Sequence, residues 1–199
     1  MELMGGDSKV KQRTFPRITE LKEGTGLKEG ALVSLGLALI TGLAAQIRLP
    51  LPFSPVPVTG QVFVVLLIGI LFGRKLGLGS QLFYVGLGGV GLPLFSGFSG
   101  GAAALAGPTG GYILGFLPAV YLVGWLSESI TLDSLLKVFS AGLAGLGAIY
   151  LFGSAQLALF LNTGLKETVA LGVVPFIWID LVKALLVALV TKVFNQAEF

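Results

Sequence analysis

The most distinctive chemical groups in the sequence are an acid and a base, Asp180 and Lys183, inside the apolar stretch PFIWIDLVKALLVALV. Placing each ionisable side chain in a hydrophobic span costs about 2.5 to 3.5 kcal/mol. A spacing of three residues puts both on one face of a helix, where they can pair with each other or hold one ligand together. A carboxylate beside an ammonium offers an acceptor and a donor, which matches the N–H and C=O of a cyclic urea or amide. The alternative is a buried ion pair that fixes the register of the helix.

Composition places the chain among integral membrane proteins. Of its 199 residues, 54% are hydrophobic and 12% are charged, and the mean hydropathy is +0.92, values outside the range of ordinary soluble domains. Cysteine and histidine are absent, which excludes disulfides, thiol nucleophiles, histidine acid–base chemistry and most transition-metal sites. We therefore expect no metal, no cofactor and no enzymatic activity.

The glycine patterns do not indicate nucleotide binding. No GxxxxGK[ST] loop occurs in the sequence, so the chain is not expected to hydrolyse ATP itself. Gly86, Gly88 and Gly91 spell GxGxxG, but they lie in an apolar span without a βαβ context. We interpret them as a helix-packing surface rather than a dinucleotide loop.

Six apolar stretches have the length needed to cross a membrane: 30–48, 58–73, 76–94, 109–127, 135–161 and 174–194. They predict an all-α integral membrane protein, a bundle of six transmembrane helices forming one membrane domain over residues 30–199. Residues 1–29 are polar and basic and predict a cytoplasmic tail. Gly73, Arg74 and Lys75 separate the second and third stretches, so that connection must be a tight hairpin.

The basic residues orient the predicted bundle. With the amino terminus in the cytoplasm, the outer loops hold only Arg48 and Lys166, and every other basic residue except Lys183 falls in the inner segments or at the inner ends of the spans. The positive-inside rule therefore places both termini in the cytoplasm. The inner set comprises Lys9, Lys11, Arg13, Arg17, Lys22, Lys28, Arg74, Lys75, Lys137 and Lys192. In such a protein the net charge of +3 reflects topology and does not predict nucleic-acid binding.

The unusual short motifs lie at the outer ends of the spans. PVPVTGQ opens the second span and PFIWID opens the sixth, while GLPLFSGFSGG follows the third and GPTGGY opens the fourth. Their convergence predicts a ligand cavity in the outer half of the bundle, closed by glycine-rich loops.

Within these motifs, several residues are candidates for ligand contact. Thr109, Gly110 and Gly111 begin a helix whose exposed amides would attract an anion, although a plain helix start is equally compatible with the pattern. Gln61 can hydrogen-bond at the start of the second span, or simply meet interfacial water. Tyr84, midway along the third span, predicts either core packing or a cavity wall with a polar tip.

Small residues recur every fourth position along the first span, at Gly30, Ser34, Ala38 and Gly42. Such a stripe lets two helix backbones approach closely. It predicts either packing within the bundle or a docking face for a separate membrane subunit.

Four motifs, in order and spacing, resemble the BioY family of biotin-binding S components of energy-coupling factor (ECF) transporters. They are PVPVTGQ, the GLGGVGLPLF segment, GPTGGYILGF and PFIWIDLVKA, and the resemblance covers about residues 30 to 195. It implies a multi-pass protein of the prokaryotic cytoplasmic membrane that captures biotin from outside with high affinity. It further implies that Asp180 and Lys183 contact the ureido ring.

The resemblance also implies partners. These are a transmembrane coupling subunit, which would dock on Gly30, Ser34 and Ala38, and a pair of ABC-type ATPases whose ATP hydrolysis drives release inside. Biotin would be enclosed between aromatic surfaces that include Tyr84, Phe95 and Tyr112. Because the loop from Phe95 to Gly107 has no Lys or Arg, we expect the carboxylate to meet backbone amides of Gly110 and Gly111, or Thr109 and Tyr112.

Three other functions are compatible with parts of the pattern. An S component for another vitamin would share the architecture, but the Asp–Lys spacing argues against it. A stand-alone secondary carrier would use Asp180 as a proton site. A membrane enzyme is disfavoured because the sequence lacks a nucleophile and base set.

Overall fold

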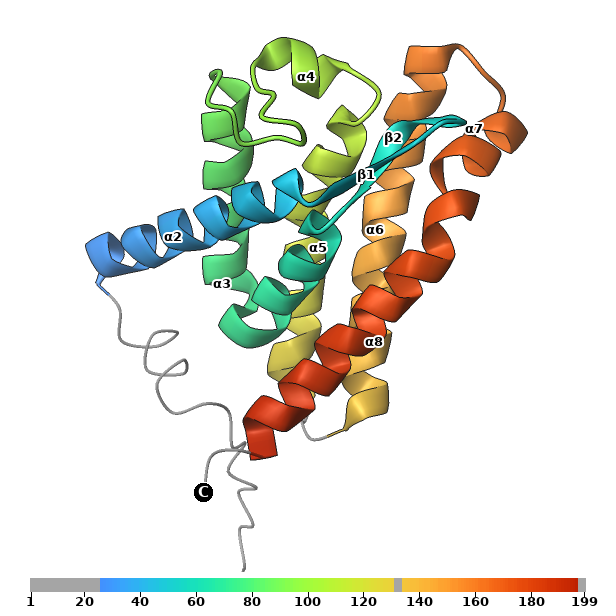
Figure 1. The fold of residues 1–199 in the computed structure, drawn as a ribbon. Helices are drawn as coiled ribbons and strands as arrows, with labels where there is room; N and C mark the ends of the chain where they lie inside the picture. Colours follow the sequence, from blue (N-terminus) through green and yellow to red (C-terminus); the bar gives the residue numbers. More distant parts are fainter. Residues whose placement is uncertain (1–25, 131–133, 197–199) are drawn as a thin grey trace, which may run out of the picture.

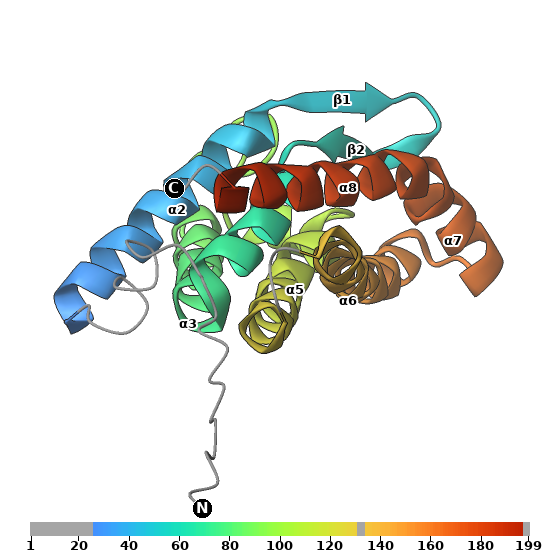
Figure 2. The ribbon, with the colours of Figure 1, turned by 90° about the horizontal axis from the view of Figure 1, so that it is seen from below.

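The computed structural model describes residues 26–130 and 134–196. Within these ranges, five helices are long and apolar enough to cross a membrane. They are α2 (Leu27–Gln46), α3 (Gln61–Gly89), α5 (Gly110–Ser129), α6 (Leu135–Leu161) and α8 (Val174–Gln196). Figure 2 shows α3, α5 and α6 side by side in one layer, with α8 lying across one face of it. The protein is therefore mainly helical, as predicted.

The first helix begins earlier than the sequence indicated. α2 starts at Leu27, inside the segment predicted as a tail, so the boundary predicted after residue 29 falls within its first turn. The basic residues of the predicted tail from Lys9 to Lys22 lie outside the described residues.

Helix α3 is folded into two arms at Gly73. This residue has φ 73° and ψ −177°, a non-helical conformation inside the helix. The Gln61 amide donates to the Tyr84 hydroxyl at 2.6 Å, although 23 residues of straight helix would separate them by about 35 Å. The turquoise and green arms in Figure 1 therefore form the tight hairpin predicted between the second and third apolar stretches.

The two arms of α3 differ in length. At about 1.5 Å per residue, the arm of residues 61–72 is about 18 Å long, less than the hydrocarbon core of about 30 Å. The second arm ends at Gly89 rather than at residue 94. Counted with α3 as one helix, the described residues thus provide five spanning helices and not six.

One part of the predicted all-α architecture is wrong. The proline-rich segment between α2 and α3 forms an antiparallel β-hairpin of β1 (Arg48–Leu51) and β2 (Ser54–Thr59), in which Arg48 pairs with Thr59. Both strands are edges, so the missing N–H of a proline is tolerated on the open side. The Ser54 hydroxyl donates to the Leu171 carbonyl at 2.8 Å and fixes the hairpin tip.

The hairpin shares one end of the molecule with two short helices, α4 (Ala102–Ala106) and α7 (Leu165–Gly172), as Figure 1 shows. The glycine-rich loop before α4 is fixed to α2 by Gln46. Its amide nitrogen donates to the Phe95 carbonyl at 3.1 Å, and its amide oxygen accepts from the Phe98 N–H at 2.9 Å. We call this end, with the hairpin, the loop and α7, the hairpin end.

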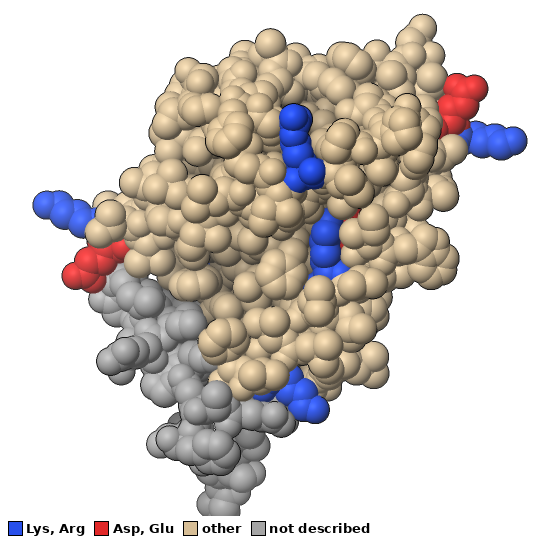
Figure 3. All heavy atoms as spheres, viewed as in Figure 1, with Lys and Arg blue, Asp and Glu red and all other residues tan. Residues whose placement is uncertain are grey.

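The opposite end carries the turn of α3. Arg74 pairs there with Glu128 in the last turn of α5, with Nε and Oε2 3.1 Å apart. Lys137 lies in the first turn of α6 and Lys192 near the end of α8. Between the two ends, charged side chains are few, and Figure 3 shows wide uncharged surface on one face. This distribution fits helices that cross a membrane.

Small residues bring the helices of the central layer close together. Val123 of α5 is wedged between Gly69 of α3 and Gly145 of α6, where a methyl group on either glycine would overlap its side chain. Gly88, in the GxGxxG pattern, contacts the Phe95 ring in the same way. Within the GxGxxG pattern the interpretation as a packing surface holds for Gly88 alone, because a methyl group on Gly86 or Gly91 would meet no atom within 4 Å.

The small-residue stripe of α2 faces mainly into the bundle. Ser34 and Ala38 are buried, and the Ser34 hydroxyl donates to the Leu76 carbonyl of α3 at 3.3 Å. A partner helix cannot reach these two residues in this conformation, so the structure supports the alternative of packing within the bundle. Gly30 is half-buried at the start of α2.

The turn at Gly73 predicts a sharp difference between two glycines of α3. Its φ and ψ lie in a region open almost exclusively to glycine, and a side chain there costs about 1–3 kcal/mol. Gly73→Ala should therefore lower the Tm of the detergent-purified protein. The control is Gly86→Ala in the same helix, where a methyl group meets no atom within 4 Å. If Gly73→Ala and Gly86→Ala have equal Tm values, a side chain at residue 73 does not strain the turn.

Candidate functional site

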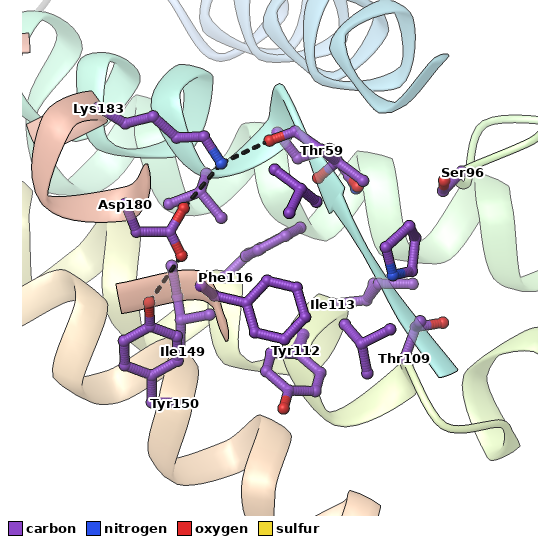
Figure 4. Close-up of a pocket in the computed structure, with 16 residues that line it drawn as sticks. Thr59, Ser96, Thr109, Tyr112, Ile113, Phe116, Ile149, Tyr150, Asp180 and Lys183 are labelled. Carbon is purple, nitrogen blue, oxygen red and sulfur yellow. Dashed lines mark hydrogen bonds and ion pairs between the residues drawn. The ribbon is translucent and has the colours of Figure 1, made fainter. Parts of the chain in front are cut away.

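A cavity lies beneath the β-hairpin. Its empty volume is about 550 Å³, including the part that opens to solvent. Apolar side chains of α5, α6 and α8 form one part of its wall and those of β2 and α3 form the other, while polar groups lie at both ends (Figure 4). The lining residues are Val56, Pro57, Val58, Thr59, Gln61, Val62, Ser96, Thr109, Tyr112, Ile113, Phe116, Ile149, Tyr150, Phe176, Asp180 and Lys183.

The acid and the base singled out in the sequence form a buried ion pair at one end of the cavity. Lys183 Nζ lies 2.7 Å from Asp180 Oδ1, and the two side chains are 13% and 5% exposed. The second carboxylate oxygen, Oδ2, accepts a hydrogen bond from the Tyr150 hydroxyl at 2.7 Å. Lys183 Nζ also donates to the Thr59 carbonyl at 2.8 Å. Three elements, α8, α6 and β2, therefore hold the pair in place.

The pair keeps unused hydrogen-bonding capacity. An ammonium has three donors and a carboxylate about four lone-pair sites, and the contacts above use two of each. Asp180 can thus accept from a ligand N–H while Lys183 donates to a ligand carbonyl. Among residues 26–130 and 134–196, no acidic side chains cluster in a way that would hold a metal ion.

The structure brings five of the predicted site residues together around the cavity. Asp180 and Lys183 lie at one end and Thr109 at the other, with Gln61 and Tyr112 on the wall. The Tyr112 hydroxyl points away from the cavity in Figure 4 and donates to the Gly172 carbonyl at 2.8 Å. Tyr112 therefore presents its ring, and not its hydroxyl, to the cavity.

Four other predicted residues do not line the cavity. Tyr84 and Phe95 are fully buried, and their rings meet edge to face with centroids 5.4 Å apart. They lie behind Gln61, whose amide bonds to Tyr84. Gly110 and Gly111 instead face neighbouring backbone, where a methyl group would overlap the Leu105 and Phe152 carbonyls respectively.

The amide of Gly110 is already engaged, since it donates to the Gly107 carbonyl at 3.2 Å. Together with the close packing of both glycines, this supports the plain helix start that the sequence left open. Their predicted role in holding an anion remains a prediction.

Sequence analysis missed several residues of the cavity, above all Tyr150. A tyrosine in the middle of an apolar span needs a partner for its hydroxyl, and that signal was present in the sequence. It does not say which partner, because Asp180 lies 30 residues away on another helix. The apolar wall residues Ile113, Phe116, Ile149 and Phe176 carry no signal that separates them from ordinary core residues.

Comparison with known proteins now gives the family. The sequence model of the BioY family matches residues 14–198, and the chain belongs to this family. The match begins within the predicted tail, earlier than the motifs indicated.

Two curated relatives cover most of the chain. The biotin transporter BioY of Thermotoga maritima is 40% identical over 74% of this chain and 86% of its own length. A probable biotin transporter BioY of Pyrococcus horikoshii is 45% identical over 79% of this chain and 90% of its own length. A crystal structure of the S-component for biotin from an ECF-type ABC transporter superposes with a TM-score of 0.76 and 25% identity. It covers 85% of this chain and 92% of its own.

The hydrogen bond from Tyr150 to Asp180 predicts a difference between two tyrosines. A bond to a charged group contributes about 1.5–3 kcal/mol, so Tyr150→Phe should lower the Tm of the purified protein. Tyr121→Phe is the control, because Tyr121 is an exposed residue of α5 for which the described residues provide no side-chain hydrogen bond. If both variants melt like the wild type, Tyr150 does not support the carboxylate.

Proposed function

We propose that this BioY-family chain is the biotin-binding S component of an ATP-driven ECF transporter. The observation that carries the proposal is the Asp180–Lys183 pair, which is held by Tyr150 and Thr59 and keeps free donor and acceptor capacity at the end of an apolar cavity. The names of the relatives and of the superposed structure support biotin as the ligand.

The chemistry of biotin fits this end of the cavity. In our proposal, Asp180 accepts an N–H of the ureido ring and Lys183 donates to its carbonyl oxygen. Tyr150 keeps the carboxylate oriented, and the ring system is desolvated against Ile113, Phe116, Ile149 and Phe176. Both ureido contacts are charge-assisted in a low-dielectric site, so they are strong and specific.

We further propose the membrane arrangement predicted from the sequence. The two arms of α3 would make the second and third of six passes, with both termini in the cytoplasm of a prokaryotic cell and residues 30–199 in one membrane domain. Four cations, Arg74, Lys75, Lys137 and Lys192, lie at the end opposite the cavity, and Arg48 and Lys166 lie at the hairpin end. This asymmetry supports a cavity that opens to the outside.

Energy for transport would come from other subunits. The sequence has no phosphate-binding loop, so we assign ATP hydrolysis to ABC-type ATPases and their coupling to a transmembrane subunit. Closure of the β-hairpin over the ligand would seal the cavity, and reorientation of the whole chain would release biotin inside. The chain itself would perform no covalent chemistry.

Titration of biotin into the detergent-purified protein tests the proposal. We expect saturable binding to the wild type, weakened about 10- to 100-fold in both Asp180→Asn and Lys183→Met, because each loses a charge-assisted hydrogen bond of about 1.5–3 kcal/mol. The matched controls are Glu128→Gln and Arg74→Met, which remove the ion pair at the opposite end and should bind biotin like the wild type. A folded wild type that binds another vitamin but not biotin would contradict the assignment.

Uptake measurements test the energy source. In cells without a biotin transporter of their own, we expect biotin uptake when the chain is expressed with a coupling subunit and active ATPases. Inactive ATPases should abolish it. Uptake by the chain alone that requires a proton gradient, and that Asp180→Asn abolishes, would instead establish a secondary carrier.

A further inference from the structure

The cavity lining is electrically neutral, although the proposed ligand is an anion. Asp180 and Lys183 are the two charged residues of the lining, and they neutralise each other. A bound carboxylate would therefore add an uncompensated negative charge to a largely apolar site, which is unfavourable without a cation nearby. The chain must supply that cation from outside the lining or leave the carboxylate in water.

The arrangement of the cavity fixes where such a cation must be. Figure 4 shows Asp180 and Lys183 at one end and Ser96 and Thr109 at the other. A ligand held by its urea at the first end would direct its other end toward Ser96 and Thr109. The Ser96 hydroxyl oxygen is buried and has no hydrogen-bond partner within the described part of the chain.

One cation lies beside this second end. The guanidinium of Arg48, in β1, packs over Gly97, the residue after Ser96, so closely that a methyl group on Gly97 would overlap it. Gly97 adopts φ +73°, a conformation that residues with a side chain rarely adopt, and its missing Cβ leaves room for the guanidinium. Gln46 holds the same loop through Phe95 and Phe98, so the loop that carries Ser96 is fixed relative to the end of α2, next to Arg48.

Arg48 is also available for a ligand. It is exposed, and the ion pairs formed by residues 26–130 and 134–196 are Asp180–Lys183 and Arg74–Glu128. A guanidinium presents a planar fork of donors that matches a carboxylate in two parallel hydrogen bonds. The positive-inside rule disfavours basic residues on the outer side of a membrane. An arginine at the hairpin end without an ion-pair partner among the described residues therefore indicates a specific role.

We propose that Arg48 binds the carboxylate of the ligand at the mouth of the cavity, with the Ser96 hydroxyl as a second donor. This inference rests on the proposed function, because it assumes a ligand with a urea at one end and a carboxylate at the other. It replaces Tyr112 and the Gly110 amide, whose hydrogens are already bonded, as carboxylate donors. Arg48 thereby sets specificity for the free acid.

Binding of biotin and of biotinamide, its uncharged amide, tests this role in the full-length protein. We expect the wild type to prefer biotin. Arg48→Gln should weaken biotin binding at least about tenfold while leaving the affinity for biotinamide unchanged. Arg48→Lys keeps the charge but loses the fork of donors, so its affinity for biotin should lie between those of the wild type and Arg48→Gln. Ser96→Ala should weaken the binding of biotin by a smaller factor and leave the binding of biotinamide unchanged. Lys166→Gln, another outer cation, is the matched control and should change neither affinity.

Three results would overturn the proposal, and each has a different consequence for the proposed function. If Arg48→Gln binds biotin as tightly as the wild type, the carboxylate does not meet Arg48, and the proposed function still holds. If the variant loses biotin and biotinamide equally, Arg48 holds the loop rather than the carboxylate. If the folded wild type binds neither compound, the proposed function fails together with this inference.

Discussion

Two opposite charges inside an apolar helix determine much of this structure. Asp180 and Lys183 are largely buried, so groups of the protein must provide most of their hydrogen-bond partners. The partners come from Tyr150 on α6 and from the Thr59 carbonyl on β2. Satisfying the pair therefore ties three separate elements together at one point and holds the β-hairpin above the cavity.

The two ends of the molecule are built differently, and a closely packed layer of helices connects them. The central layer is packed through glycines, and Val123 between Gly69 and Gly145 is the clearest case. The turn of α3 and its Arg74–Glu128 pair close the opposite end. At the hairpin end the backbone is irregular, and loops are fixed by single side chains such as Gln46 and Ser54. A closely packed helical layer thus supports an end built from a hairpin, loops and short helices, and this end contains the cavity.

The polar groups at the two ends of the cavity differ in accessibility. The Asp180–Lys183 end is buried and neutral, suited to a group that has both donors and acceptors. The Ser96 end lies beside an exposed arginine, suited to an anion. Separating these groups across an apolar wall lets a long ligand be recognised by its polar ends and desolvated along its middle.

The sequence by itself determined the features that depend on local pattern. Hydropathy located the helices, the i, i+3 spacing paired Asp180 with Lys183, and Gly73 marked the turn of α3. Four ordered motifs gave the family. Tertiary structure alone decided which residues meet across elements. It paired Tyr150 with Asp180, turned Ser34 and Ala38 inward, and buried Tyr84 and Phe95 behind the cavity wall. The physical reason is that a helical or apolar period is set by neighbours in the chain. Contacts such as Lys183 to Thr59, 124 residues apart, exist only after the helices pack.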